Sequence, residues 1–184
     1  MKDKMPTLKN IINSSKKGDR LAQRQLYEAY YSYGVSICMR YASHKEEAYE
    51  MLNDGFFKVF TKLDKYDMEL PFRPWFKVVV VNAAIDYYRR KKSFETSDLE
   101  QTHTKVVDDF DIEEQLAYDD LIKVIQQLSP AYRAVFNLYE IEGYKHHEIA
   151  DILAISVGTS KSNLSKAKGK LKKLIEKNLQ TKMN

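Results

Sequence analysis

This chain of 184 residues has a single cysteine and no long apolar run. Cys38 is the single cysteine, which excludes an internal disulfide framework and fits a reducing compartment. No apolar run approaches the roughly 20 residues of a membrane-spanning helix. Residues 1–19 carry charge without an apolar core segment, so they do not form a secretory signal. We therefore expect a cytoplasmic protein without direct membrane insertion.

Glycine and proline are few, at six and four residues, while Leu, Lys, Glu, Ala and Tyr are plentiful, which favours helix. The fractions of 43% apolar and 30% charged residues describe a soluble globular chain of one domain or two small ones. His147-Glu148 is similar to the start of a zinc-protease helix, but Asp151 stands where the second histidine is required. No glycine-rich phosphate loop is present. We therefore predict no metal, no cofactor and no enzyme, and expect His146 and His147 to flank DNA or solvent.

The net charge of +4 conceals a strong segregation along the chain. Residues 1–92 hold 18 Lys and Arg against 11 Asp and Glu, and residues 121–184 hold 11 against 5. Between them, residues 93–120 hold one lysine against 10 acids. Two basic lobes separated by an acidic spacer suit a polyanionic partner, because each phosphate contact releases counterions. A solvated charged face is the common alternative for any single block.

Helical periodicity dominates residues 1–92. Residues 8–40 read as two helices broken at Gly18, with Asp19 as the cap of the second. Residues 44–63 form an amphipathic helix, whose acidic group near the start suits the helix dipole. The functional alternative for that group is a docking surface for a basic partner. It comprises Glu46, Glu47, Glu50 and Asp54.

A loop over residues 64–73 precedes the run WFKVVVVNAAIDYYRRKK at residues 75–92. Four consecutive valines are also typical of a buried strand. The stripe Phe76, Val79, Val80, Ala83 and Tyr87 fits a helix, and no second strand-like run exists to pair with, so we predict helix. Its basic end lies beside aromatic rings, and this combination suits phosphates and unpaired bases. Core packing is the alternative for each ring.

Residues 93–112 show no sustained period and are predicted to be a linker. A helix then follows with the apolar residues Leu116, Leu121, Val124, Ile125 and Leu128. Ser129-Pro130 provides a cap and a first-turn proline for the next helix. That helix should bury Val135, Phe136, Leu138 and Tyr139 before it breaks at Gly143.

Residues 143–167 are predicted to form two short helices around a tight turn. Ile149, Ala150 and Leu153 share one face, and Ser156 can cap the second helix. Leu164, Ala167, Leu171 and Leu174 point inward, which leaves a polar, basic outer face able to meet base edges and phosphates in a major groove. An ordinary helical hairpin with a solvated basic face is the alternative.

The run LSPAYRAVFNLYEIEGYKHHEIADILAISVGTSKSNLSKAKGKL resembles region 4 of the extracytoplasmic-function (group IV) RNA polymerase sigma factors. The runs AYEMLNDGFFKVFTKLDKYD and FRPWFKVVVVNAAIDYYRRKK resemble region 2 of that class, in the family's order and spacing. IEGYKHHEIA and GTSKS are similar to Bacteroidetes members in particular. The resemblance implies an all-α fold, with region 2 in residues 1–92, a flexible acidic linker in residues 93–112, and region 4 with its helix-turn-helix in residues 113–184.

The resemblance also implies a transcription initiation factor with three partners: core RNA polymerase, promoter DNA and an anti-sigma protein, the last often at the inner face of the membrane. Residues implied to dock on core polymerase are Asp54, Phe57, Lys58 and Phe60. Residues implied to recognise and melt the minus-ten element are Lys65, Phe72, Arg73, Trp75, Asn82, Asp86, Arg89 and Arg90. Residues implied to bind the minus-thirty-five element are Thr159, Lys161, Ser162, Asn163, Ser165 and Lys166.

Three residues depart from the family pattern. Ser160 stands near the buried face where relatives often have valine, so either the turn packs more loosely or the hydroxyl bonds back to a carbonyl. Asn163 and Lys166 stand where many relatives have arginine, which disfavours arginine readout of guanine there. The alternative function is a helix-turn-helix regulator with an N-terminal sensor domain, but residues 1–92 show no strand runs and no acidic pocket of a receiver.

Overall fold

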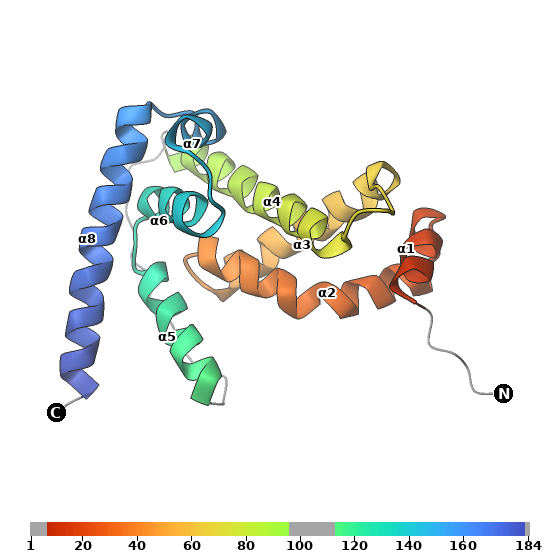
Figure 1. Cartoon of the computed structure of the whole chain (residues 1–184), viewed down its shortest axis with the longest axis horizontal. Coiled ribbons are helices and arrows are strands. Elements are labelled where there is room, and N and C mark those ends of the chain that lie inside the picture. The colour runs from red at the N-terminus through yellow and green to blue at the C-terminus, as the bar shows by residue number, and fades with distance from the viewer. Residues whose placement is uncertain (1–6, 96–112, 183–184) are drawn as a thin grey trace. The chain divides into compact units, whose positions relative to one another are not determined.

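The computed structural model describes residues 7–95 and 113–182, and within these ranges the chain is helical with no strand (Figure 1). This confirms the predicted all-α class. The elements are α1 (Leu8–Lys16), α2 (Arg20–Tyr41), α3 (Lys45–Lys62), η1 (Leu63–Lys65), α4 (Phe72–Glu95), α5 (Glu113–Gln126), α6 (Pro130–Phe136), η2 (Asn137–Ile141), α7 (His146–Leu153) and α8 (Val157–Lys182). The chain divides into a first unit of residues 1–38 and 49–84 and a second unit of residues 39–48 and 85–184.

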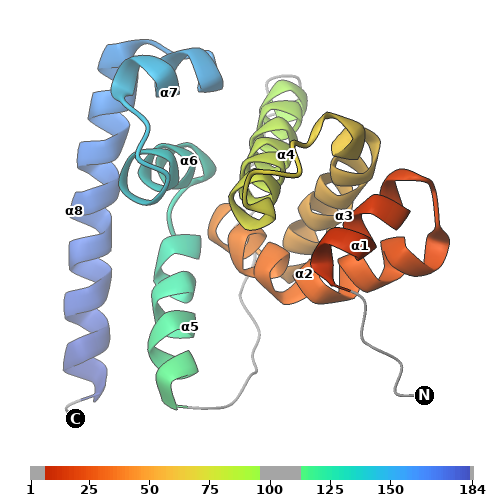
Figure 2. The same ribbon diagram turned by 45° about the vertical axis from the view of Figure 1, so that its right-hand side comes forward.

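The core of the first unit is an aromatic cluster in which α2, α3 and α4 meet (Figure 2). Phe76 of α4 is fully buried, and its ring centroid lies 5.0 Å from that of Tyr30 in α2 and 5.3 Å from that of Phe56 in α3. Gly34 lets the helices approach, because a Cβ there would lie 2.4 Å from Leu52 Cδ1 and 3.3 Å from Phe76 Cζ. Large aromatic side chains stabilise a small core strongly because each buries a large area.

Helix α4 confirms the helical interpretation of the four valines. Val79, Val80 and Val81 are buried, whereas Val78 is 50% exposed, so only part of the run faces the core. The helix is longer than predicted at both ends, since it begins at Phe72, inside the expected loop, and ends at Glu95, inside the expected linker. Pro74 fits the first turn because the first helical N–H groups have no intrahelical acceptor. The rest of the predicted linker, residues 96–112, lies outside the described residues.

In the second unit, α8 packs along α5 and α6 (Figure 1). Val124, Ile125 and Leu128 form a core cluster with Ala167 and Leu171. The predicted burial of Leu121 and Tyr139 is wrong, since these side chains are 47% and 37% exposed. For Tyr139 the cause is local: α6 ends at Phe136 and the next five residues form a π-helical turn. A turn of i→i+5 hydrogen bonds rotates the following side chains away from the α-helical register.

The turn between α7 and α8 contains a left-handed residue that is not glycine. Ala154 closes α7 with φ 50° and ψ 55°, and its N–H donates to carbonyls of the last turn. A Cβ in this region clashes mildly with the backbone, and glycine avoids that cost.

We expect Ala154→Gly to raise the free energy of unfolding by about 0.5–1 kcal/mol, the relief of left-handed strain exceeding the added entropy of the unfolded chain. Thermal unfolding followed by circular dichroism measures this. Ala131→Gly, in the first turn of α6 where the backbone is right-handed, should instead destabilise. A lower melting temperature for Ala154→Gly would contradict the expectation.

Within the described residues, no helix is long and apolar enough to cross a membrane.

Candidate nucleic-acid interface

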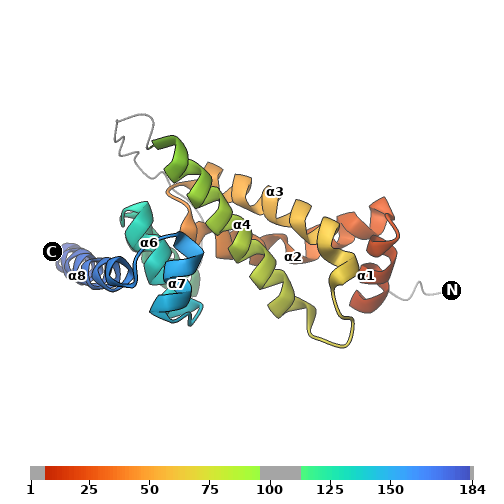
Figure 3. The same cartoon turned by 90° about the horizontal axis from the view of Figure 1, so that it is seen from above.

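Helices α7 and α8 form the helix-turn-helix, and Figure 3 shows them side by side. Glu148 closes the start of α7 by accepting the Lys145 N–H at 2.7 Å. Ser156 caps α8 as predicted, since its hydroxyl accepts the Thr159 N–H at 2.9 Å. The inward residues Ile149, Ala150, Leu153, Leu164, Ala167 and Leu171 are buried. The outward set is exposed except for Asn163, which is half-buried: Thr159, Lys161, Ser162, Ser165 and Lys166.

Neither alternative proposed for Ser160 describes its surroundings. Its side chain is fully buried, and its hydroxyl lies 2.9 Å from Nδ1 of His146 at the start of α7. The imidazole stacks on the ring of Tyr139, with centroids 4.5 Å apart and planes 25° apart. His146 is therefore engaged within the helix-turn-helix, while His147 is exposed.

The residues assigned to the minus-ten element gather along α4. Trp75, Asn82, Asp86 and Arg89 are spaced by seven, four and three residues, which places them along one side of the helix. Asn82, Arg89 and Arg90 are exposed, and Trp75 and Asp86 are half-buried. Trp75 packs on Tyr66 and Phe72, with centroids 5.1 and 5.5 Å away. The helix thus presents one aromatic ring near its start and two arginines near its end.

The residues assigned to the loop differ in exposure. Lys65 in η1 is exposed. Phe72 is only 4% exposed and packs edge-on against Tyr30 and Tyr66. Its side chain therefore belongs to the core that supports the loop. The Arg73 guanidinium carbon lies 4.1 Å from the Tyr33 ring centroid, so the guanidinium group makes a cation–π contact with this ring.

The residues assigned to polymerase docking lie on α3. Asp54, Phe57 and Lys58 share one face at spacings of three and four residues. Phe57 is 71% exposed, although its neighbour Phe56 is only 3% exposed. Phe60 is half-buried, and its ring stacks on that of Phe56 with the centroids 6.0 Å apart. It therefore connects this face of α3 to the core.

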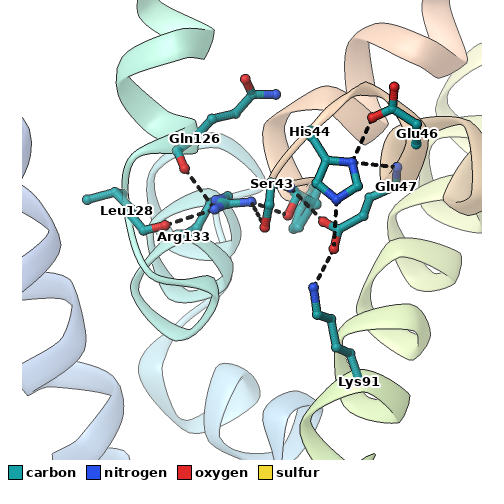
Figure 4. Close-up of polar contacts among 9 residues, drawn as sticks. Ser43, His44, Glu46, Glu47, Lys91, Gln126, Leu128 and Arg133 are labelled. Carbon is teal, nitrogen blue, oxygen red and sulfur yellow. Dashed lines mark hydrogen bonds and ion pairs between the residues drawn. The ribbon is translucent and has the colours of Figure 1, made fainter. Parts of the chain in front are cut away.

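A buried arginine that the sequence analysis did not single out organises the second unit. Arg133 is 2% exposed, and its Nη1 donates to the Tyr41 carbonyl at 3.0 Å and to Ser43 Oγ at 3.3 Å (Figure 4). Its Nη2 donates to the carbonyls of Gln126 and Leu128, at 2.9 and 2.8 Å. Burial lowers the pKa of Arg133 to about 10, so the guanidinium remains charged at neutral pH.

The carbonyls at the end of α2 receive these side-chain donors because a helix leaves its last carbonyls without intrahelical partners. Asn137 Nδ2 donates to the Arg40 carbonyl at 2.6 Å, and Gln126 Nε2 donates to the Met39 carbonyl at 3.1 Å. The Arg40 guanidinium pairs with Glu142 at 3.3 Å. Helix α2 therefore ends on polar side chains of the same unit.

Glu47 is buried, against the prediction that it belongs to an exposed acidic face (Figure 4). It accepts the Ser43 N–H at 2.7 Å and pairs with Lys91 at 2.5 Å, and His44 Nε2 lies 3.7 Å away. Burial raises the pKa of Glu47, but the hydrogen bonds from Lys91 and Ser43, with the charges of Lys91 and His44, outweigh it and lower the pKa overall. Its ionised form is thus favoured in the folded chain.

This lowered pKa predicts an acid-labile contribution to stability. The Glu47 carboxyl group has a lower pKa in the folded chain than in the unfolded chain. Its contribution to the free energy of unfolding is therefore present above its ordinary pKa of 4.5 and is lost as pH falls below that value. We expect Glu47→Gln to cost about 1–2 kcal/mol at neutral pH and to flatten the acid limb of the stability curve. Urea unfolding between pH 7 and pH 3 measures both. Glu28→Gln, on an exposed side chain, is the control, and an unchanged acid limb in Glu47→Gln would contradict the assignment.

Both halves of the chain match models of known protein families. The family model "Sigma-70 region 2" matches residues 26–94, and "Sigma-70, region 4" matches residues 118–171. The first therefore covers α3 and nearly all of α4, and the second covers the helix-turn-helix. Together they span every residue assigned to polymerase or DNA.

Curated relatives include sigma factors that are similar over most of this chain. SigW of Bacillus subtilis, an ECF RNA polymerase sigma factor, is 28% identical over 178 residues, which cover 90% of this chain and 95% of SigW. SigE of Mycolicibacterium smegmatis, also an ECF sigma factor, is 24% identical, over 77% of this chain and 56% of SigE. Among solved structures, the sigma factor RpoE with the anti-sigma factor NepR from Bartonella quintana is 19% identical with a TM-score of 0.49, over 83% of this chain and 96% of RpoE.

The chain belongs to the extracytoplasmic-function class of RNA polymerase sigma factors. It directs RNA polymerase to promoters, and the alternative of a sensor-linked regulator is not favoured.

Proposed function

We propose that three helices divide the work of promoter recognition: α3 docks on core polymerase, α4 recognises and melts the minus-ten element, and the start of α8 binds the minus-thirty-five element. The observation that carries this proposal is the exposed polar face of α8, which begins directly after a capped turn and lies opposite a buried face that is apolar except for Ser160. We also propose that residues 1–92 act as region 2 and residues 113–184 as region 4, with residues 93–112 between them. We propose that the chain acts by binding and not by catalysis.

Melting the minus-ten element requires a surface on which an extruded base can stack and positive charge that contacts the DNA backbone. We propose that α4 supplies both. Extruding a base costs a few kcal/mol of unstacking, which a stacking surface and backbone contacts offset. Trp75 offers a half-buried ring beside the loop that carries Lys65, and Arg89 and Arg90 offer exposed charge for phosphates. Phe72 and Arg73 hold the loop end through their ring contacts.

The substitution Lys161→Ala tests the proposed contact with the minus-thirty-five element. Lys161 is exposed on the second turn of α8. We expect a loss of about 1–3 kcal/mol in binding if the lysine contacts a base, and less with a shallower salt dependence if it contacts only phosphate. Titration of the polymerase holoenzyme with promoter DNA at two salt concentrations distinguishes these cases. Unchanged binding at both would remove Lys161 from the interface.

The proposed partners are core RNA polymerase, promoter DNA and an anti-sigma protein. The last follows from the family resemblance, as does a cytoplasmic location in which the anti-sigma protein holds the chain at the inner membrane face.

One experiment tests the proposal as a whole. The purified chain is mixed with core RNA polymerase and a promoter library, and transcript starts are sequenced. Specific starts that share two elements support the proposal. A regulator would bind duplex DNA by itself and leave core polymerase without specific starts.

A further inference from the structure

The contact between His146 and Ser160 is the least ordinary feature of the helix-turn-helix. Ser160 is completely buried at the side of α8 that faces α7. Its hydroxyl lies 2.9 Å from His146 Nδ1. A buried hydroxyl without a partner is destabilising, so the imidazole at this point matters.

Tyr139 determines how the imidazole is oriented. Its ring, in the π-helical turn η2, stacks on the imidazole at 4.5 Å and 25°, which restricts rotation of the histidine side chain. The ring plane thus holds Nδ1 in the direction of Ser160. Contacts therefore run from η2 through the first residue of α7 to the end of the first turn of α8.

Ser160 lies between two residues assigned to DNA. Neighbours on a helix project about 100° apart, so Thr159 and Lys161 leave α8 on opposite sides of the buried hydroxyl. A rotation or slide of α8 at Ser160 moves both side chains together. Base readout tolerates little of this, because hydrogen-bonding groups that shift by about 1 Å lose much of their interaction energy.

We propose that His146 and Ser160 are a positioning pair that fixes α8 against α7 and thereby sets how well the chain discriminates the minus-thirty-five element. The inference rests on the proposed function of α8 and adds two residues that do not themselves contact bases. His146 is half-buried, so water can reach the imidazole when the hydrogen bond is lost. The loss therefore loosens the angle between the helices and does not unfold the unit.

The test is a double-mutant cycle in the full chain bound to core polymerase. Ser160→Ala removes the hydroxyl, and His146→Phe keeps a ring to stack on Tyr139 but cannot hydrogen-bond. The quantity measured is the ratio of affinities for a promoter with both elements and for the same promoter with its minus-thirty-five element scrambled. His147→Phe, the same change at the exposed neighbouring histidine, is the matched control.

We expect each single variant to lower this ratio by about threefold to tenfold, and the double variant to lower it no further than one of them. His146→Asn, whose amide takes the place of Nδ1, should recover part of the ratio. Ratios that are unchanged, or losses that multiply in the double variant, would overturn the positioning pair. If the unmodified chain itself does not discriminate between the two promoters, the proposed role of α8 fails instead.

Discussion

Replacing Arg133 with methionine is expected to lower the free energy of unfolding of the second unit by about 2–4 kcal/mol. Methionine fills a similar length but donates no hydrogen bond. The carbonyls of Tyr41, Gln126 and Leu128 would each lose a donor. A buried acceptor left without a partner costs about 1–3 kcal/mol, and relief from burying the guanidinium charge offsets part of this sum.

Urea unfolding followed by circular dichroism measures the effect at neutral pH, where Arg133 is charged. Arg133→Lys should show an intermediate loss, because one ammonium cannot reach the carbonyls on both sides of the planar guanidinium. Arg24→Met is the matched control, since Arg24 is exposed and pairs with Glu28 only one turn away. That change should leave the free energy of unfolding almost unchanged, because an exposed ion pair is screened by water and salt. An Arg133→Met variant as stable as the unmodified chain would show that apolar packing can replace the whole network.

Periodicity predicted the helices of this chain well because each has an apolar face that pairs with another helix. The valine run of α4 is the clearest example, since three of its four side chains are buried and the fourth is half exposed. Local chemistry also predicted the caps at Asp19 and Ser156, whose side chains accept N–H groups two or three residues later. Ser129 is a partial exception, since it occupies the cap position without a side-chain bond.

What periodicity could not predict are features that depend on distant partners. Periodicity gave no sign that Arg133 and Glu47 are buried. The carbonyls of Tyr41, Gln126 and Leu128 compensate for the burial of Arg133, and the Ser43 N–H and the ammonium of Lys91 compensate for that of Glu47. The π-helical turn that exposes Tyr139 follows from no local signal that the sequence analysis used. Ser160 was recognised as unusual, but its partner lies 14 residues earlier in the chain. Among the candidate site residues, Phe72 was assigned from a family pattern that does not distinguish a contact with DNA from support beneath it.

Replacing Phe57 with alanine is expected to weaken binding to core RNA polymerase by about 2–3 kcal/mol, or roughly 30- to 150-fold. An aromatic ring that is 71% exposed contributes little to the isolated fold, so the melting temperature should stay unchanged. Exposed aromatics that become buried on association are the residues that dominate interface energies. Titration of labelled chain with core polymerase measures the affinity, and Leu21→Ala, at a 66% exposed position of α2, is the control.

The neighbouring phenylalanine makes this prediction stringent. Phe56 is 3% exposed and packs on Phe76, so Phe56→Ala should destabilise the first unit by about 3–5 kcal/mol and weaken polymerase binding only through unfolding. Two identical substitutions at adjacent positions should therefore affect different quantities, stability at Phe56 and affinity at Phe57. If Phe57→Ala binds core polymerase with full affinity while remaining folded, the docking surface does not include this face of α3. Asp54 and Lys58, which share the face, would then lose their assignment with it.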